Sequence, residues 1–268
     1  MRTGYYDCHL HSQMSFDSHL TMNRIAEIAY DLDFSGITYT DHVDFDYPGL
    51  GDKVFDIEEY YKNLKRVQEK FAGKLEILGG VEIGMQPHLA DRNWAFVEKM
   101  KPDFIIGSVH SCQRCDIYDG SFTAGKNQLQ AYTAYLEEIL TNIKAHTYFH
   151  VLGHLDMILR VADYPCRSFE ASECKLLVQD ILWELISTGR GIEVNSSGWR
   201  YGLNGPHPSF KIIKRYHDMG GTIITCGSDA HRTYSVGEDL KEAYQLVKEA
   251  GFKEMSLFVG GKEEKIVL

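Results

Sequence analysis

The sequence predicts an α/β barrel, on the basis of two observations. Apolar runs with strand character alternate with longer segments of helix character, which is typical of βαβ units that form a parallel sheet. Polar side chains able to bind metal ions follow most of the strand-like runs, and barrel enzymes build their sites on the face where the strands end. Ligands from so many strands can converge only if the sheet closes into a ring, so we expect a barrel with seven strands.

The first expected strand is a short apolar and aromatic opening that leads into Asp7-Cys8-His9-Leu10-His11. Six further apolar runs have strand character: 36–40, 75–81, 104–109, 148–152, 191–194 and 222–226. A last run, 255–259, could add an edge strand. His11-Ser12-Gln13 follows the first strand in place of a glycine-rich phosphate loop, which disfavours an open, doubly wound sheet.

Helix candidates separate the strands, at 22–32, 57–71, 94–100, 129–144, 173–188, 210–219 and 240–250. Three of them follow residues whose side-chain oxygens can cap a helix, namely Thr21, Asp56 and Ser172. Glycines lie where three helices should end, at Gly189, Gly220 and Gly251. No linker, low-complexity segment or repeat divides the chain, so we expect residues 1–268 to form a single domain.

Composition limits the classes of partner. The net charge of −10 disfavours nucleic acid, because affinity for its backbone comes mostly from clustered Lys and Arg. No apolar run is long enough to span a membrane, and Met1-Arg2-Thr3 leads into the first strand without a signal peptide. The six scattered cysteines are typical of reduced thiols. We therefore expect a cytoplasmic protein with a small-molecule substrate, of undetermined oligomeric state.

The opening strand carries the first metal-binding motif. Side chains alternate between the two faces of a strand, so Asp7, His9 and His11 should project to the same side. Two imidazoles at this spacing can hold one metal ion, and a carboxylate beside them can orient an imidazole. Similar polar motifs end the later strands: Thr40-Asp41-His42, Gly80-Val81-Glu82, Ser108-Val109-His110, His154-Leu155-Asp156 and Ser228-Asp229-Ala230-His231.

These residue types indicate metal-dependent hydrolysis. Imidazole and carboxylate without thiolate suit catalytic zinc, manganese or iron. Several such ions would generate hydroxide from a bridging water and clamp the oxygens of an in-line displacement, as phosphate-ester hydrolysis requires. Neither a GxSxG nucleophile motif nor a P-loop is present. Attack by a metal-bridging hydroxide is therefore favoured over a covalent intermediate.

In order and type, these motifs resemble those of the polymerase-and-histidinol-phosphatase (PHP) family, from residue 7 to residue 231. The resemblance implies a distorted (β/α)7, TIM-like barrel that holds two to three divalent ions. It assigns ligands to three metals: His9, His11, Glu82 and Asp229 to the first; Glu82, His110 and His154 to the second; Asp17, His42 and His231 to the third. His19 competes with Asp17 for its place, and Asp7 and Asp41 are expected to support the histidines or to cap turns.

Within the family, the chain resembles the stand-alone histidinol-phosphatases. The segment Glu193-Val194-Asn195-Ser196-Ser197-Gly198-Trp199-Arg200 carries this likeness. It implies hydrolysis of L-histidinol phosphate to L-histidinol and orthophosphate in histidine biosynthesis. Arg160 and Arg200 could bind the phosphate oxygens as bidentate donors, and the loop Asp44-Phe45-Asp46-Tyr47 could receive the ammonium and imidazole. A metal-bound water, Asp229 or His231 could protonate the leaving group.

Three other functions are open to the same motifs. A PHP nuclease or a phosphoesterase for nucleotides or other small phosphate esters could use the same cluster, although a nuclease should show a basic, aromatic groove. A non-catalytic metal-binding module should have lost ligands, and none of the expected positions is apolar. An amidohydrolase barrel also opens with HxH but adds a metal-bridging lysine, whereas this chain offers Glu82.

Overall fold

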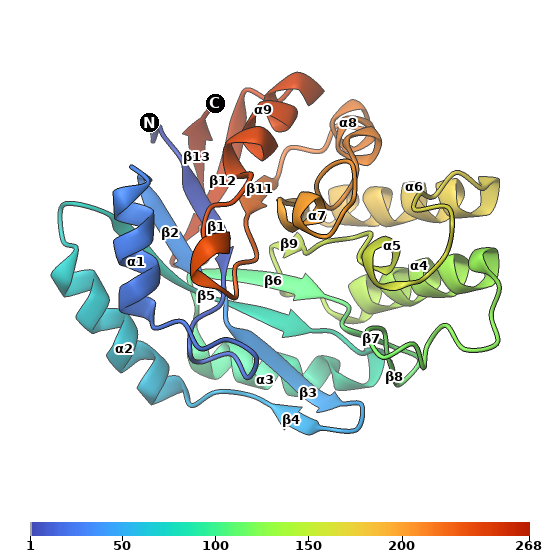
Figure 1. Cartoon of the computed structure of the whole chain (residues 1–268), viewed down its shortest axis with the longest axis horizontal. Coiled ribbons are helices and arrows are strands. Elements are labelled where there is room, and N and C mark those ends of the chain that lie inside the picture. The colour runs from blue at the N-terminus through green and yellow to red at the C-terminus, as the bar shows by residue number, and fades with distance from the viewer. Residues whose placement is uncertain (1) are drawn as a thin grey trace.

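The computed structural model describes residues 2–268. Seven parallel strands form one curved sheet, in the order β1 (Tyr6–Leu10), β2 (Gly36–Tyr39), β5 (Glu76–Gly84), β6 (Phe104–Ser108), β9 (Val151–Leu152), β10 (Gly191–Asn195) and β11 (Ile224–Gly227). Two backbone hydrogen bonds join the residues just after β11 to the end of β1. The Asp229 amide donates to the His9 carbonyl at 2.8 Å, and the His11 amide donates to the Ala230 carbonyl at 3.1 Å. The predicted barrel of seven strands is confirmed as a nearly closed one (Figure 1).

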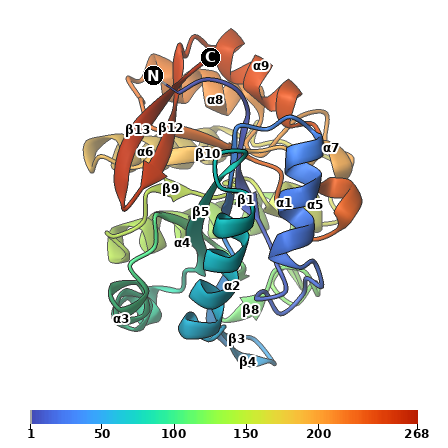
Figure 2. The same ribbon diagram turned by 90° about the vertical axis from the view of Figure 1, so that its left-hand side faces the viewer.

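Helices surround the sheet on its outer side (Figures 1 and 2). The longer ones are α1 (Met22–Asp31), α2 (Ile57–Lys70), α3 (Ala90–Met100), α4 (Gln128–Ala145), α6 (Ser172–Ser187), α8 (Phe210–Asp218) and α9 (Leu240–Ala250). Short helical turns occupy loops: η1 (Pro87–Leu89), α5 (Ile158–Val161), α7 (Ser197–Arg200) and η2 (Thr233–Ser235). All seven predicted helices are present, with α3 starting four residues earlier than the sequence suggested, at Ala90 instead of Trp94.

Two of the three predicted N-caps are confirmed. Thr21 accepts a hydrogen bond from the Arg24 amide, and Asp56 accepts one from the Glu59 amide. The prediction for Ser172 was wrong, because Ser172 is the first residue of α6 and its hydroxyl donates to the Glu173 carboxylate. At the other end, Gly251 terminates α9 with a φ of 115°, which a residue with a Cβ adopts only with strain.

A strand that the sequence did not suggest positions part of the site. β3 (His42–Tyr47) forms a hairpin with β4 (Gly51–Lys53) and also pairs in parallel with β5. The long β5 pairs with β2 through its first half and with β3 through its second half. This register places His42 directly beside Glu82 at the end of the barrel where the strands finish.

Two further hairpins lie off the barrel sheet. β7 (Ser111–Cys112) and β8 (Cys115–Asp116) form a short antiparallel hairpin after β6. The predicted strand at 255–259 is present as β12 (Glu254–Val259), but it pairs antiparallel with β13 (Lys262–Val267) in a separate sheet and does not extend the barrel sheet. The partner strand was missed because it begins with four consecutive charged residues, which obscured its strand character. Figure 2 shows this hairpin close to both termini, and the Val267 amide donates to the Arg2 carbonyl at 3.0 Å.

The apolar core fills the interior and the layer between sheet and helices, as Ile25 of α1 and Ile37 of β2 illustrate with no solvent exposure. Buried histidines and carboxylates gather instead at the C-terminal ends of the strands. All six cysteines are free thiols within residues 2–268. Over the same residues, every helix is too short or too polar to cross a bilayer.

Candidate metal centre

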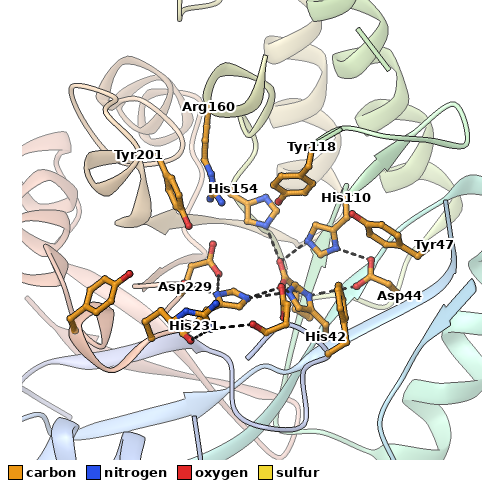
Figure 3. Close-up of a pocket in the computed structure, with 15 residues that line it drawn as sticks. His42, Asp44, Tyr47, His110, Tyr118, His154, Arg160, Tyr201, Asp229 and His231 are labelled. Atoms are coloured by element: carbon orange, nitrogen blue, oxygen red, sulfur yellow. Dashed lines mark hydrogen bonds and ion pairs between the residues drawn. The ribbon is translucent and has the colours of Figure 1, made fainter. Parts of the chain in front are cut away.

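A cavity of about 480 Å³ opens at the end of the barrel where the strands finish (Figure 3). Seven of the nine predicted metal ligands line it: Asp17, His42, Glu82, His110, His154, Asp229 and His231. The other two, His9 and His11, are fully buried. The sequence motifs therefore converge on one cavity, although they lie on strands from both ends of the chain.

The four residues predicted for the first metal point their donor atoms at one another. The Nε2 atoms of His9 and His11 are 3.0 Å apart. Glu82 Oε2 lies 3.2 Å from the first and 3.4 Å from the second. Asp229 Oδ1 lies 3.3 Å from His11 Nε2 and 3.7 Å from His9 Nε2. A single cation at the centre could contact all four side chains.

Glu82 also faces the residues predicted for the second metal, using its other oxygen. Glu82 Oε1 is 2.9 Å from His154 Nε2 and 3.2 Å from His110 Nε2. The Ser108 hydroxyl donates to the same oxygen at 2.6 Å. One carboxylate thus presents an oxygen to each of two groups of imidazoles, which is the geometry of a bridging ligand.

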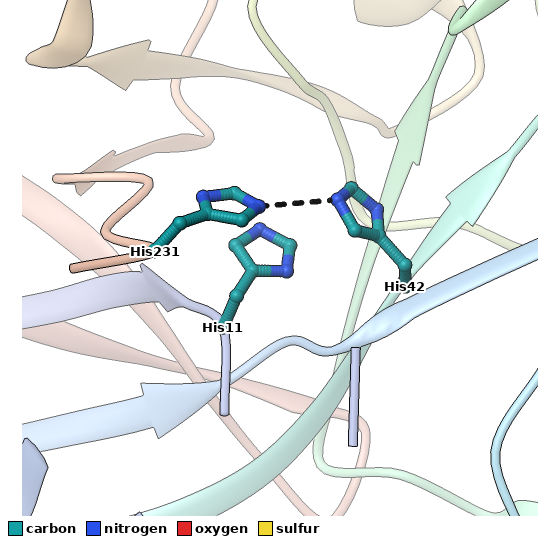
Figure 4. A group of neighbouring side chains, drawn as sticks. All are labelled: His11, His42 and His231. Atoms are coloured by element: carbon teal, nitrogen blue, oxygen red, sulfur yellow. Dashed lines mark hydrogen bonds between the residues drawn. The ribbon is translucent and has the colours of Figure 1, made fainter. Parts of the chain in front are cut away.

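The third predicted group lies nearest the cavity mouth. Asp17 Oδ2 is 3.3 Å from His231 Nε2 and 3.6 Å from His42 Nε2. The two imidazole nitrogens are 3.4 Å apart, and His11 lies beside both rings (Figure 4). His19, the alternative to Asp17, is exposed and does not line the cavity. The geometry therefore places Asp17 with this group.

The cluster has the electrostatic character of a cation site. Glu82 Oε2 is buried and lacks a hydrogen-bond donor among the described residues, which is costly unless a cation satisfies it. Burial would raise the pKa values of Glu82 and Asp229, but the charge of His9 and its neighbouring imidazoles holds both well below their usual range. The donors are oxygen and nitrogen without thiolate, a set that suits zinc, manganese or iron.

The carboxylate of Asp44 lies close to the Nδ1 atoms of two of these imidazoles. His110 Nδ1 contacts Asp44 Oδ1 at 2.8 Å, while Asp44 Oδ2 is buried without a hydrogen-bond partner and lies 3.6 Å from His42 Nδ1. A Cβ at Gly84 would collide with the Asp44 carboxylate, so the glycine makes room for it. Asp44 had been expected only in a substrate loop. Its strand parity with His42 was the signal that could have revealed this position.

Asp7 and Asp41, the two aspartates predicted to support the histidines, both accept hydrogen bonds from serines. Asp41 accepts hydrogen bonds from the Ser12 and Ser15 hydroxyls at 2.7 and 2.8 Å, and the Ser15 hydroxyl reaches His11 Nδ1 at 3.0 Å. Asp7 accepts from the Ser228 amide at 2.9 Å and from its hydroxyl. Asp7 therefore anchors the loop that carries Asp229 and does not contact an imidazole ring nitrogen.

The two predicted phosphate-binding arginines lie in different surroundings. Arg160, on α5, lines the cavity with its guanidinium carbon 3.3 Å from the Tyr201 ring centre (Figure 3). Its Nη1 is buried and has no hydrogen-bond partner among the described residues. Stacking fixes the plane of the guanidinium while leaving donors free. Arg160 is therefore poised to bind an anion beside the histidines.

Arg200 does not line the cavity. Its guanidinium pairs with Glu238 at 2.7 Å and donates to the carbonyls of Ser228 and Asp229 at 2.8 and 3.3 Å. Asp229 has a φ of 54°, an uncommon conformation for a residue with a side chain. The sequence had suggested that Arg200 binds the phosphate. In the structure its donors instead hold the loop that carries Asp229.

Several cavity residues were not found by sequence reasoning. Phe16, Tyr118 and Tyr234 form aromatic parts of the wall, and Arg232 adds a cation. These residues lie in loops without a recognisable pattern. Arg232 had one signal, because it directly follows the motif that ends in His231.

Comparisons with known proteins agree with this geometry. Residues 7–197 match the PHP domain. The chain is 30% identical over 262 residues to a histidinol-phosphatase of Lactococcus lactis, covering 97% of this chain and 96% of that protein. A probable histidinol-phosphatase of Clostridium acetobutylicum is 28% identical over 251 residues, covering 92% of this chain and 94% of that protein.

A solved structure has the same fold over nearly the whole chain. The crystal structure of histidinol phosphate phosphatase from Lactococcus lactis, complexed with zinc, L-histidinol and phosphate, superposes with a TM-score of 0.89 at 27% identity. The match covers 98% of this chain and 100% of that one. Together with the converging ligands and the domain match over more than half of the residues, these likenesses establish that the chain belongs to the PHP domain family.

Proposed function

We propose that this protein is a metal-dependent phosphatase that hydrolyses L-histidinol phosphate to L-histidinol and orthophosphate. The observation that carries the proposal is a cavity lined by seven imidazole and carboxylate side chains, with His9 and His11 buried beside them, in a fold shared with a relative that binds zinc, L-histidinol and phosphate. The relative's ligands supply the substrate class. We further propose that residues 1–268 act as one catalytic domain, since a single sheet spans residues 6–227.

The proposed ligands fall into three groups: His9, His11, Glu82 and Asp229; Glu82, His110 and His154; Asp17, His42 and His231. Divalent ions bound there would acidify a water molecule and neutralise charge on the phosphoryl oxygens. Zinc has support from the Lactococcus lactis complex. The donor types also suit manganese and iron.

Arg160 is proposed to bind the phosphoryl group directly. It is held by Tyr201, has an unpaired donor and faces the same cavity as His154. A planar guanidinium can give two parallel hydrogen bonds to a phosphate. These bonds would strengthen as negative charge builds up on the equatorial oxygens in the transition state.

The leaving oxygen of histidinol needs a proton, and the chain offers two candidate groups for this transfer. Asp229 and His231 both line the cavity, and His231 is the more accessible, with a side chain 25% exposed against 8% for Asp229. Burial would raise the pKa of Asp229, but the imidazoles around it hold this pKa well below the usual range, so the carboxylate carries no proton to give. We propose that His231 or a metal-bound water would supply the proton. Asp17 and His42, the other two members of the third ligand group, keep His231 oriented toward the cavity.

The cavity walls suit a small substrate with a flat end. Tyr47, Tyr118 and Tyr234 provide aromatic surfaces against which an imidazole could stack. Arg160 and Arg232 provide positive charge within the same cavity for the phosphate. The flat end and the phosphate end of the substrate thus have different partners in the cavity.

Phosphate release from a panel of esters tests the proposal. Zinc-, manganese- and iron-loaded protein would be assayed with L-histidinol phosphate, nucleotides, sugar phosphates and an aryl phosphate. We expect L-histidinol phosphate to have the highest kcat/KM. A preference for a nucleotide or sugar phosphate would overturn the substrate assignment while leaving the metal centre in place.

A further inference from the structure

Glu193 is a buried carboxylate that faces the metal centre without lining the cavity. It lies on β10, is 1% exposed, and is absent from the cavity wall, so it is placed to contact ligands and not substrate. Its strand lies between β9 and β11, and the loops that follow these two strands carry His154 and Asp229. A charge so deep in a barrel is costly unless its surroundings use it.

Three N–H groups converge on this carboxylate. Glu193 Oε1 lies 2.5 Å from His9 Nδ1. Glu193 Oε2 accepts from the backbone amide of His154 at 2.9 Å and from Asn195 Nδ2 at 3.2 Å. The same Asn195 nitrogen donates to Asp229 Oδ2 at 3.3 Å. One side chain therefore touches His9, fixes the backbone at His154, and reaches Asp229 through a single amide.

The adjoining strands leave space for this arrangement. A Cβ at Gly227 would lie 3.0 Å from Glu193 Oε1, and one at Gly153 would lie 3.5 Å from Glu193 Oε2. Either added carbon would also collide with another neighbour, the Cβ of His9 in the first case and the Ser108 hydroxyl in the second. Of the two glycines, Gly227 is the one that leaves room for the Glu193 carboxylate beside His9, because the 3.5 Å distance from Gly153 is an ordinary contact.

We propose that Glu193 is a positioning residue for the metal centre, which fixes the ring of His9 and couples it to His154 and Asp229. With Nδ1–H donated to Glu193, the Nε2 atom of His9 keeps its lone pair directed at Glu82 and His11. A carboxylate behind an imidazole ligand makes the ligand more basic and holds its orientation. The inference rests on the metal centre of the proposed function but not on its substrate.

The arrangement requires a carboxylate and not an amide. A carboxylate has acceptor positions on both oxygens, whereas glutamine replaces one oxygen with an NH₂ donor. In Glu193→Gln, that donor would face either His9 Nδ1–H or the two N–H groups of His154 and Asn195. The isosteric change therefore breaks the network with almost no change in volume.

Zinc affinity and the zinc-dependent rise in melting temperature would be measured on metal-free protein titrated with Zn²⁺. We expect Glu193→Gln to bind Zn²⁺ about 10- to 100-fold more weakly than the native protein. We also expect zinc to raise its melting temperature by less. A purely structural role would lower the melting temperature with and without zinc and leave the rise unchanged. Thr225→Val is the matched control, because Thr225 lies beside Glu193 in the strand register and its buried hydroxyl has no hydrogen-bond partner among the described residues.

Wild-type zinc affinity in Glu193→Gln, or an equal loss in Thr225→Val, would overturn the inference. If Glu193→Gln does not fold, Glu193→Asp keeps the charge but falls short of His9, and wild-type affinity in that variant would overturn it equally. Failure of the native protein to hydrolyse L-histidinol phosphate, with Glu193→Gln still weakened for Zn²⁺, would count against the proposed function alone.

Discussion

His42 and Glu82 lie side by side in the register of β3 and β5, with His42 Nδ1 3.0 Å from Glu82 Oε2. Glu82 also faces His9, His11, His110 and His154, so it contacts members of all three proposed ligand groups. A side chain with so many donor neighbours can stay buried and ionised only with compensating positive charge. This relationship makes Glu82 the most informative position for mutation.

Glu82→Gln should disturb two metal sites at once. The amide keeps the size of the side chain but replaces one oxygen, so it cannot present an anionic oxygen to both groups of imidazoles. We expect fewer metal ions per chain and a large loss of phosphatase activity. Metal analysis of the purified protein measures the first effect. Unchanged stoichiometry with full activity would exclude a bridging role.

Asp44→Asn should weaken metal binding through His110. The Asp44 carboxylate contacts His110 Nδ1 at 2.8 Å, and its loss is expected to lower metal affinity or activity about 10- to 100-fold. Asp46→Asn is the matched control, because Asp46 lies on the same strand with its side chain 55% exposed and pairs with His88. Equal effects in the two variants would show that general charge, and not the contact with His110, matters.

Arg160→Ala should lower kcat/KM while leaving the metal content at its original level. A charged donor to the transition state is expected to contribute about 2 to 4 kcal/mol, and Arg160→Lys should restore part of it because lysine lacks the planar fork. Steady-state kinetics on L-histidinol phosphate would measure this change. Near-normal kinetics in Arg160→Ala would leave phosphate binding to the metals and other residues.

Arg200→Ala should act differently, although both arginines were predicted to bind the phosphate. Arg200 donates to the carbonyls of Ser228 and Asp229, so its removal should loosen the loop that presents Asp229. We expect weaker metal binding, with activity recovering in excess zinc. A loss of kcat/KM at full metal occupancy, as large as that of Arg160→Ala, would instead indicate that Arg200 contacts the phosphate.

His146 should make the metal-free protein sensitive to acid. Its Nδ1 donates to the Asn142 carbonyl and its Nε2 accepts from Asn93. Burial, with the nearby charge of Arg190, lowers its pKa to about 4. The unfolded chain, with a histidine pKa of about 6.5, therefore takes up the proton first as the pH falls. The stability that neutral His146 contributes is complete above about pH 6.5 and is lost toward pH 4.

Unfolding by denaturant at pH 7 and pH 5 tests this sign. Between pH 7 and pH 5, the free energy of unfolding of His146→Gln should fall by about 2 kcal/mol less than that of the native protein. His19→Gln, which removes an exposed histidine, is the control and should follow the native sequence. An equal loss in the native protein and His146→Gln would contradict the assignment of a buried neutral imidazole.

Much of the site could be predicted because its ligands lie at strand ends with simple spacing. Extended backbone at the end of β1 and just beyond it brings His9 and His11 together, and the parallel topology brings Glu82, His110 and Asp229 to the same end of the barrel. These are local or topological rules. They require no knowledge of how distant side chains pack.

The remaining features depend on packing that a single sequence does not encode locally. Asp44 reaches His110 only because β3 pairs with the second half of β5, and Arg200 turns to Glu238 only because α7 lies beside the loop after β11. The aromatic wall, including Tyr118 and Tyr201, comes from irregular loops. Sequence pattern predicts ligands on regular strands far better than contacts made by loops.

Phosphate release from L-histidinol phosphate before chelation, after chelation and after zinc is restored tests the central claim most directly. We expect activity to vanish with the metal, to return with Zn²⁺, and to have a kcat/KM at least about a hundredfold above that for an aryl phosphate, because substrate groups remote from the phosphorus contribute to transition-state binding. Activity that survives complete metal removal, or equal efficiency on both esters, would contradict the account.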